Sequence, residues 1–262
     1  MTARRYAAPM TKRFDGRVVL VTGAGSGIGR ATALRLGSEG AAVGALDRDS
    51  EGSLRTSREI TATGGHCIPL SADVSQESDV ERAMMLVSRN VGRLSGLVSC
   101  AGIFDPGDGR LAADVELESF MTVLGVNLVG TFLAVKYALP HLVEQRGALV
   151  TIASTAAVRG HGFGSGYTAS KGGVDALTRL LAVQYGKHGV RANCICPGGV
   201  DTPMTGGTFA TPEAIERAKR TVPIGHHAQP EDIGDVAVFL LTADARHLTG
   251  VTLPVEGGAT IA

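Results

Sequence analysis

Thr22-Gly23-Ala24-Gly25-Ser26-Gly27-Ile28-Gly29 is the stretch that decides the fold, because it joins an apolar run to a helical pattern through a cluster of glycines. The apolar run covers residues 18–21, and the helical pattern covers residues 30–39. A helix N-terminus carries unpaired N–H groups and a partial positive charge, and glycines let a phosphate approach those groups closely. Glycine-rich turns also join ordinary strands to helices, so the loop alone is weak support for a phosphate site.

The next apolar run ends in Leu46-Asp47-Arg48, which places Asp47 eighteen residues after Gly29. An acid at the end of the second strand can accept hydrogen bonds from the ribose hydroxyls of adenosine. Arg48 is the counter-argument, since a guanidinium can bind the 2′-phosphate of NADP. Strand, glycine turn, helix, strand and acid in this order predict a dinucleotide site that prefers NAD.

Short apolar runs alternate with longer helical stretches from residue 17 onward, which is typical of βαβ units. The runs lack strict alternation, as expected when helices cover both faces of a parallel sheet. We therefore expect an α/β fold, a single doubly wound, Rossmann-like domain with a seven-stranded parallel sheet. The expected strands lie at residues 18–21, 42–46, 67–70, 96–99, 148–153, 191–196 and 251–255.

The domain is expected to span residues 10–262 without a linker. Residues 1–9 are basic and lack acids, which suits a disordered tail better than a short targeting peptide. Met10 is an alternative start of the natural chain, and the sequence leaves that choice open.

The composition argues against several kinds of partner. The 25 basic and 25 acidic residues give a formal net charge of zero, so no global field attracts nucleic acid or an anionic membrane. We find no apolar run near the roughly 18 residues of a membrane span, and no signal peptide. We expect a cytoplasmic protein that binds small molecules. The four cysteines are interpreted as reduced core residues: Cys67, Cys100, Cys194 and Cys196.

Tyr167 and Lys171 are four residues apart in a helical pattern, so their side chains lie on one face, one turn apart. An ammonium group near a phenol stabilises the phenolate and lowers a phenol pKa that is about 10 in water. The oxidation of an alcohol needs such a proton-transfer group. The same spacing also arises by chance, so the pair alone leaves the chemistry open.

A larger set of motifs resembles the short-chain dehydrogenase/reductase family in order and spacing, over about residues 14–258. Ser154 stands thirteen residues before Tyr167, as the catalytic serine of the family does. The resemblance implies an oxidoreductase with a nicotinamide cofactor. The matching positions are Thr22, Gly23, Gly27, Ile28, Gly29, Asp73, Asn127, Ser154, Tyr167, Lys171, Pro197 and Gly198.

The resemblance implies a role for each catalytic position. Tyr167 would exchange a proton with the substrate oxygen, while Lys171 would lower the pKa of that phenol and hold the nicotinamide ribose. Ser154 would orient the substrate oxygen and share its charge. Asn127 would hold a water that links Lys171 to solvent.

The resemblance also implies contacts along the cofactor, with Asp73 at the adenine and residues 197–202 at the nicotinamide. Together with the glycine loop and Asp47, these contacts complete the expected cofactor-binding set. Its members are Gly23, Ser26, Gly27, Ile28, Gly29, Asp47, Arg48, Asp73, Val74, Cys100, Ala101, Gly102, Tyr167, Lys171, Pro197, Gly198, Val200 and Thr202.

Cys100-Ala101-Gly102 departs from the family, which usually has Asn-Ala-Gly after the fourth strand. The amide normally ties strands together beside the cofactor, and a thiol is a weak donor and acceptor. We expect a structural effect, because Ala101 and Gly102 still let the cofactor pass. A redox-active Cys100 is the alternative to a small buried residue.

Other residues carry weaker indications. His226 and His227 are adjacent and lack a further ligand at metal spacing, so we expect no metal. His161 is interpreted either as a substrate contact or as a solvent-facing residue of a glycine-rich loop at residues 159–166. The charges at residues 213–220 suit a solvated short helix.

Long apolar and helical segments bear on assembly. Residues 118–145 are apolar on most sides, so we expect them to be largely buried, in the domain or against another subunit. Residues 172–185 predict a packed crossover helix. The resemblance implies a homotetramer with two-fold axes, in which residues 250–262 join a second interface.

Three functions are compatible with these residues. The favoured one is an NAD-linked dehydrogenase of a secondary alcohol. The second is an NADPH-linked 3-oxoacyl-thioester reductase of the same family, against which Asp47 argues. The third is a non-catalytic module that senses NAD, against which the complete Ser, Tyr, Lys and Asn set argues. Specificity is expected to reside in two irregular segments, residues 157–166 and 204–224.

Overall fold

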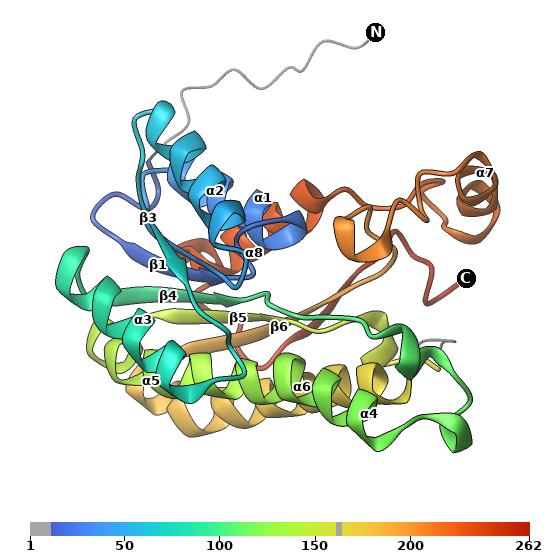
Figure 1. Ribbon diagram of the computed structural model, residues 1–262. Coiled ribbons are helices and arrows are strands. Elements are labelled where there is room, and N and C mark those ends of the chain that lie inside the picture. Colours follow the sequence, from blue (N-terminus) through green and yellow to red (C-terminus); the bar gives the residue numbers. More distant parts are fainter. Residues whose placement is uncertain (1–11, 161–163) are drawn as a thin grey trace, which may run out of the picture.

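The computed structural model in Figure 1 describes residues 12–160 and 164–262. One sheet of seven parallel strands, ordered β3-β2-β1-β4-β5-β6-β7, runs through the middle of these residues. The doubly wound α/β fold is therefore confirmed, and each expected strand overlaps an observed one. The strands are β1 (Val18–Thr22), β2 (Ala42–Asp47), β3 (His66–Ser71), β4 (Leu94–Ser99), β5 (Ala148–Ile152), β6 (Arg191–Pro197) and β7 (Thr252–Val255). The expected tail at residues 1–9, the alternative start at Met10 and the possible substrate contact of His161 lie outside the described residues.

Helices cover both faces of the sheet, as Figure 1 shows. One layer holds α1 (Gly27–Ser38), α2 (Ser50–Ala62) and α8 (Pro230–Leu241). The other layer holds α3 (Glu77–Asn90), α5 (Gly130–Gln145) and α6 (Ser165–Tyr185). Two shorter helices, α4 (Leu117–Leu124) and α7 (Pro212–Thr221), lie beyond one end of the sheet, on the right in Figure 1.

The two helical layers explain why the strands are apolar without alternation. Successive residues of a strand point to opposite faces, so Val19 and Val21 of β1 belong to the core under α1 and α8. Val18 and Leu20 belong to the core under α3 and α5. Both faces exclude water, so a polar residue there needs a partner in the protein, as Thr151 of β5 has in the Thr178 hydroxyl, 2.7 Å away.

The strand order reverses at β1, which pairs with β2 on one side and with β4 on the other. In open parallel sheets, ligands bind beyond the carboxyl ends of the strands at such a switch point. The loops that leave β1 and β4 separate here, one toward each helical layer. This topology places the glycine loop at the mouth of a cleft.

Residues 117–145 differ from the expectation in two respects. They form one helical stretch in which a π-helical turn, η3 (Gly125–Val129), separates α4 from α5. The stretch is long and apolar enough to cross a membrane by length and composition, although we expected no run of that size. Its α5 part packs against β4 and supplies Leu133, Leu139 and Leu142 to the core, so it is a core helix.

Helix α6 begins two turns earlier than the expected crossover helix at residues 172–185. Ser165 and Gly166, the last two residues of the loop expected at residues 159–166, are already helical. The sequence conceals this start because glycine has a poor helix propensity and the residue that caps the helix lies far away in the chain. As a result Tyr167 stands in the first turn of α6.

Candidate active site

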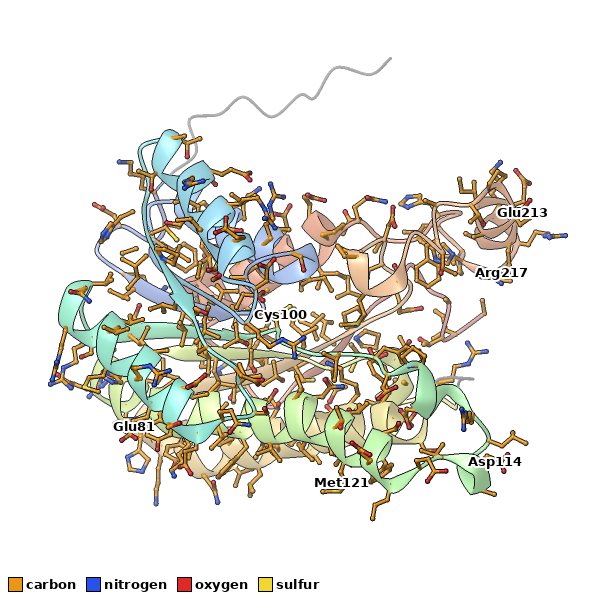
Figure 2. All side chains as sticks on the ribbon, viewed as in Figure 1. Glu81, Cys100, Asp114, Met121, Glu213 and Arg217 are labelled. Carbon is orange, nitrogen blue, oxygen red and sulfur yellow. The ribbon has the colours of Figure 1, made fainter. Side chains whose placement is uncertain are left out.

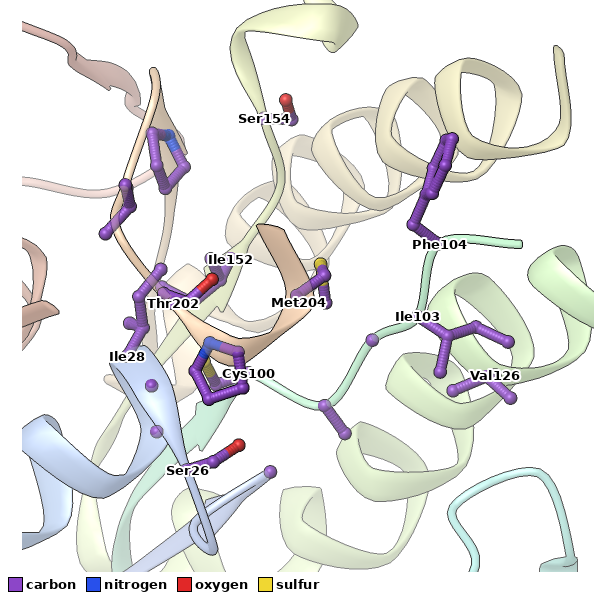
Figure 3. A pocket seen from close by; sticks show the side chains of 18 of the residues that line it. Ser26, Ile28, Cys100, Ile103, Phe104, Val126, Ile152, Ser154, Thr202 and Met204 are labelled. Carbon is purple, nitrogen blue, oxygen red and sulfur yellow. The ribbon is translucent and has the colours of Figure 1, made fainter. Parts of the chain in front are cut away.

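A cavity of about 530 Å³ opens at the carboxyl ends of the strands. Its lining includes every member of the cofactor-binding set expected from the sequence, together with Ser154. Figure 3 shows Ser26, Cys100 and Thr202 at one end of this cavity, and Phe104 and Ser154 at the other. The fold therefore brings the glycine loop and the Tyr167-Lys171 pair into one space.

The glycine loop adopts backbone angles that favour glycine. Gly23 and Gly27 have φ values of 69° and 49°, in the left-handed region that side chains disfavour. A Cβ added at Gly23 would lie 2.9 Å from the backbone of Ala101, so this glycine also permits a close approach of two loops. The loop leads into α1, whose N-cap Ser26 makes no capping hydrogen bond and whose first turn contains no acid. The N–H groups at this helix start are left for a ligand.

Asp47 lies at the end of β2, where its carboxylate faces the glycine loop. Oδ2 accepts a hydrogen bond of 2.8 Å from the Gly25 N–H, and Oδ1 accepts one of 2.9 Å from the Asp49 N–H. These bonds fix the carboxylate, yet two carboxylate oxygens offer about four acceptor positions in total. Acceptor capacity therefore remains for two ribose hydroxyls. Arg48 lines the same cavity but is exposed.

The remaining cofactor positions border the cavity from two further loops. Asp73 and Val74 follow β3, and the Asp73 carboxylate accepts hydrogen bonds from the backbone and hydroxyl of Ser75 at 2.9 and 2.7 Å. Pro197 ends β6, and the chain continues past the cavity to Thr202. Thr202 closes the other side of the glycine loop, 3.2 Å from where a Cβ of Gly27 would stand.

Thr22 joins the ends of β1 and β4, where the sequence departs from the family. Its hydroxyl oxygen accepts hydrogen bonds of 3.1 Å from both the Cys100 and the Ala101 N–H groups. The Thr22 hydroxyl thus joins the two strands through the backbone N–H groups of the loop after β4, and the Cys100 side chain is not needed for this contact. Burial raises the pKa of the Cys100 thiol to about 12, which disfavours the thiolate that redox chemistry needs.

Tyr167 and Lys171 occupy successive turns of α6. Lys171 is buried, with 4% of its surface exposed, and its Nζ lies 5.8 Å from the centroid of the Tyr167 ring. Nζ donates a hydrogen bond of 2.8 Å to the Ile152 carbonyl at the end of β5. Ser154 follows β5 two residues later, and its Oγ accepts a hydrogen bond of 3.1 Å from the Ala156 N–H.

Asn127 lies in the π-helical turn and is the one expected catalytic residue that does not line the cavity. Its Oδ1 accepts a hydrogen bond of 2.8 Å from the Ile103 N–H, and its Nδ2 donates to the Ile103 carbonyl and the Ser170 hydroxyl at 3.1 Å. The side chain thereby ties the loop after β4 to α6. A Cβ at Gly102 would lie 3.2 Å from Asn127 Oδ1 and 3.4 Å from Lys171 Nζ, so these two residues meet at that glycine.

Comparison with known proteins agrees with the family resemblance of the sequence motifs. A sequence model of the family described as Enoyl-(Acyl carrier protein) reductase matches residues 23–260. Levodione reductase from Leifsonia aquatica is 38% identical over 261 residues, which cover 96% of this chain and 97% of that protein. The chain belongs to the short-chain dehydrogenase/reductase family.

Further members of the short-chain dehydrogenase/reductase family cover nearly the whole chain. Meso-2,3-butanediol dehydrogenase from Serratia marcescens is 35% identical, with 95% of this chain and 96% of that protein covered. A crystal structure of a 3-oxoacyl-[acyl-carrier protein] reductase with bound NAD from Brucella melitensis has a TM-score of 0.89 at 28% identity, covering 100% and 99% of the two chains. The protein is therefore an oxidoreductase of this family that acts on alcohol or ketone substrates.

Specificity was expected to reside in residues 157–166 and 204–224: residues of the second segment line the substrate end of the cavity, whereas none of the described residues of the first does. This end is formed by the loop after β4 and by the segment after β6, which contains the short helix η6 (Pro203–Thr205). No motif marks these positions, because their side chains meet only in the folded protein. Apart from Lys171 beside Tyr167, the described residues that line this end carry no charge: Ile103, Phe104, Val126, Ser154, Tyr167, Met204, Thr205, Thr208 and Phe209.

The other residues that the sequence singled out lie apart from this chemistry. His227 packs against Phe209, with ring centroids 4.4 Å apart, and within the described ranges 12–160 and 164–262 no cluster of metal-ligating side chains occurs. The charged side chains of α7 are exposed, as Figure 2 shows for Glu213 and Arg217. All four cysteines are free thiols. Cys67, Cys194 and Cys196 are buried as expected, whereas Cys100 is half-buried and lines the cavity.

Proposed function

We propose that the protein interconverts a secondary alcohol and a ketone by hydride transfer with NAD, with Tyr167 as the proton-transfer group. One observation carries the proposal: Ser154, Tyr167 and Lys171 line the same cavity as the glycine loop and Asp47. Four free thiols suit a reducing compartment, so the cytoplasm is the proposed location.

The residues divide the reaction between them. A bound nicotinamide supplies or accepts the hydride. During reduction, the Tyr167 hydroxyl donates its proton to the substrate oxygen, and during oxidation the phenolate takes the proton back. The Lys171 ammonium stabilises that phenolate, and the Ser154 hydroxyl donates a hydrogen bond to the substrate oxygen as charge develops on it. Asn127 ties the loop after β4 to α6 through its hydrogen bonds to Ile103 and Ser170.

The cofactor fits the residues that are present. The uncapped N-terminus of α1 offers N–H groups to the pyrophosphate, and Asp47 offers acceptors to the adenosine ribose. The 2′-phosphate of NADP would stand beside the Asp47 carboxylate. Two unit charges about 4 Å apart at an effective dielectric near 20 repel by about 4 kcal/mol, and solvent at the cleft reduces this to roughly 2 kcal/mol.

Apart from Lys171, the substrate end has an uncharged lining, which favours a neutral alcohol or ketone with an apolar body. A second candidate is the reduction of a 3-oxoacyl thioester, which the NAD-bound 3-oxoacyl-[acyl-carrier protein] reductase among the structural relatives favours. A protein that only senses NAD would not need Tyr167, Lys171 and Ser154 in one cavity.

The test is a screen of neutral secondary alcohols, their ketones and a 3-oxoacyl thioester, with NADH and NADPH absorbance as the readout. On the best substrate, kcat/KM with NAD should exceed that with NADP by at least about thirtyfold. Asp47→Ala should shrink this ratio, while Arg48→Ala should not invert it. A wild-type preference for NADP, or a ratio that Asp47→Ala leaves unchanged, would contradict the role of Asp47.

A further inference from the structure

Asp108 is a buried carboxylate that the proposed reaction does not use. It lies in the short helix η1 (Pro106–Gly109) after β4, and none of its surface is exposed. Oδ1 accepts a hydrogen bond of 2.7 Å from the Gly166 N–H, and Oδ2 accepts one of 2.7 Å from the Tyr167 N–H. One carboxylate thus holds the first turn of α6 at the residue that carries the phenol.

Helix α6 has no N-terminal cap of its own. Its N-cap residue is Gly164, which makes no side-chain hydrogen bond, and its first turn contains no acid. The first N–H groups of a helix lack partners within the helix, and a carboxylate satisfies both these donors and the partial positive charge. Asp108 stands 58 residues before Gly166 in the sequence, yet its carboxylate accepts the hydrogen bonds that the side chain of an N-cap residue usually accepts.

Two glycines make room for this carboxylate. A Cβ at Gly164 would lie 2.1 Å from Asp108 Oδ2, and a Cβ at Gly166 would lie 3.2 Å from Oδ1. Any side chain at Gly164 would therefore displace the Asp108 carboxylate. Gly164 and Gly166 make this segment resemble a simple loop, but they leave the space that the buried Asp108 carboxylate occupies.

The segment that carries Asp108 also contacts the catalytic ring. Phe104 packs edge-on against the Tyr167 ring, with centroids 6.1 Å apart. The segment is fixed at Ile103 by Asn127, and Asp105 orders its turn by accepting a 2.7 Å hydrogen bond from the Gly107 N–H. Backbone and ring of Tyr167 are therefore held from one loop, which also lines the substrate end of the cavity.

We propose that Asp108 is a positioning residue for Tyr167, which fixes the start of α6 so that the phenol meets the substrate oxygen bound at Ser154. The inference rests on the proposed function. A shift of about 1 Å in a catalytic group can cost about 100-fold in rate, so a looser first turn should slow the reaction. The cofactor site, built mainly from the glycine loop and Asp47, should be little affected.

The experiment compares Asp108→Ala, Asp108→Asn and the wild type. NADH titration by fluorescence counts the cofactor-binding sites and gives their Kd, and kcat is then expressed per binding site. Asp108→Ala should lower kcat per site at least about tenfold with an unchanged Kd. The kcat per site of Asp108→Asn should lie between those of the wild type and Asp108→Ala. The asparagine carbonyl oxygen still accepts one N–H, while its amide group cannot accept the other. Amide hydrogen exchange of residues 165–171 should be faster in both variants.

Asp232→Ala is the matched control, because Asp232 Oδ2 accepts a 2.8 Å hydrogen bond from the Gln229 N–H at the start of α8, on the opposite face of the sheet. It should lower Tm without changing kcat per site. Equal kcat per site in Asp108→Ala and Asp232→Ala, or unchanged exchange at Gly166 and Tyr167, would overturn the proposal. If the wild type turns over no alcohol or ketone, the proposed function fails instead, and the exchange measurement still decides whether Asp108 holds the turn.

Discussion

In the proposed reaction Tyr167 and Lys171 have separable tasks, although they share one face of α6. The phenol of Tyr167 would carry the proton, while Lys171 would act on that phenol and on the nicotinamide ribose. Tyr167→Phe keeps the ring, and with it the edge contact to Phe104, but removes the reacting oxygen. We therefore expect cofactor Kd to stay within about twofold and kcat to fall by about 100-fold or more.

Lys171→Ala is the comparison that makes this prediction specific. It removes a buried ammonium group together with its 2.8 Å hydrogen bond to the Ile152 carbonyl. Cofactor Kd should rise and kcat should fall in this variant, as measured by NADH titration and steady-state rates. A Tyr167→Phe enzyme that keeps more than about a tenth of wild-type kcat would exclude the assigned role.

The residues of the site differ in how far the sequence reveals them. Asp47 and the glycine loop follow from local order along the chain, because strand, turn and helix fix where each side chain must stand. Ser154 and Asn127 are found only through the family resemblance, since nothing local distinguishes them from other small polar residues. Asp108 escapes both routes, because its partners are backbone N–H groups 58 residues or more away.

The secondary-structure elements also differ in how far the sequence predicts them. The strands are predictable because they are short, mostly apolar runs between longer helical stretches, as expected when two helical layers cover a parallel sheet. The start of α6 is not, because Gly164 and Gly166 disfavour a helix locally and only tertiary capping by Asp108 offsets this. The sequence does not predict the π-helical turn around Asn127 either, because one extra residue does not change the pattern of a generally apolar stretch.

The end of helix α1 is held by a buried acid, Glu39. Its side chain is 2% exposed and accepts hydrogen bonds from the Arg13 guanidinium at 2.6 Å and from Arg35 at 2.7 Å. Arg13 precedes β1, so the pair joins the start of the described chain to the end of α1. Burial raises the pKa of Glu39, but the hydrogen bonds from Arg13 and Arg35 outweigh it, and the net pKa lies below the ordinary value of 4.5.

A lowered folded-state pKa fixes the sign of the pH dependence. Glu39 contributes stability fully above its unfolded pKa, and this contribution is lost as pH falls through the lower folded pKa. Glu39→Gln should decrease the free energy of unfolding by about 1.5–3 kcal/mol near pH 7, and the difference from wild type should shrink below about pH 4.5.

Urea denaturation at pH 7 and at several acidic values measures this difference. The matched control is Glu144→Gln, because Glu144 pairs with Arg93 at 2.8 Å while its side chain is 51% exposed. An exposed pair contributes at most about 1 kcal/mol, so Glu144→Gln should hardly change the free energy of unfolding. Equal losses in the two variants, or a Glu39→Gln loss that persists at low pH, would contradict the assignment.

The molecule as a whole leaves an apolar face uncovered. Residues 118–145 were expected to be largely buried, and the structure buries only part of this stretch, where α5 packs on β4 and α4 packs on α6. Figure 2 shows Met121 on α4 directed away from the sheet. Helix α6 also exposes large apolar side chains. The large apolar side chains exposed on these helices are Leu117, Met121, Val129, Phe132, Leu180 and Val183, from 44% to 81% exposed.

Large apolar side chains exposed on neighbouring helices are typical of a subunit contact, and a closed two-fold assembly places the face of one copy against that of another. We propose that the protein is a homotetramer in which α4, α5 and α6 form one interface and residues 250–262 join a second. Sedimentation at micromolar concentration should give four times the chain mass of 26.9 kDa. A monomer at that concentration would contradict the proposal.

Phe132→Glu tests the first interface directly. Phe132 is 48% exposed, so a glutamate there is solvated in the separate subunit but would be buried without a partner in the assembly. Its sedimentation should show dimers or monomers, with Tm lowered as contacts are lost. Leu86→Glu is the matched control, because Leu86 is 43% exposed on α3, outside the proposed face. An unchanged mass for Phe132→Glu, or the same dissociation in Leu86→Glu, would show that α4, α5 and α6 do not form the contact.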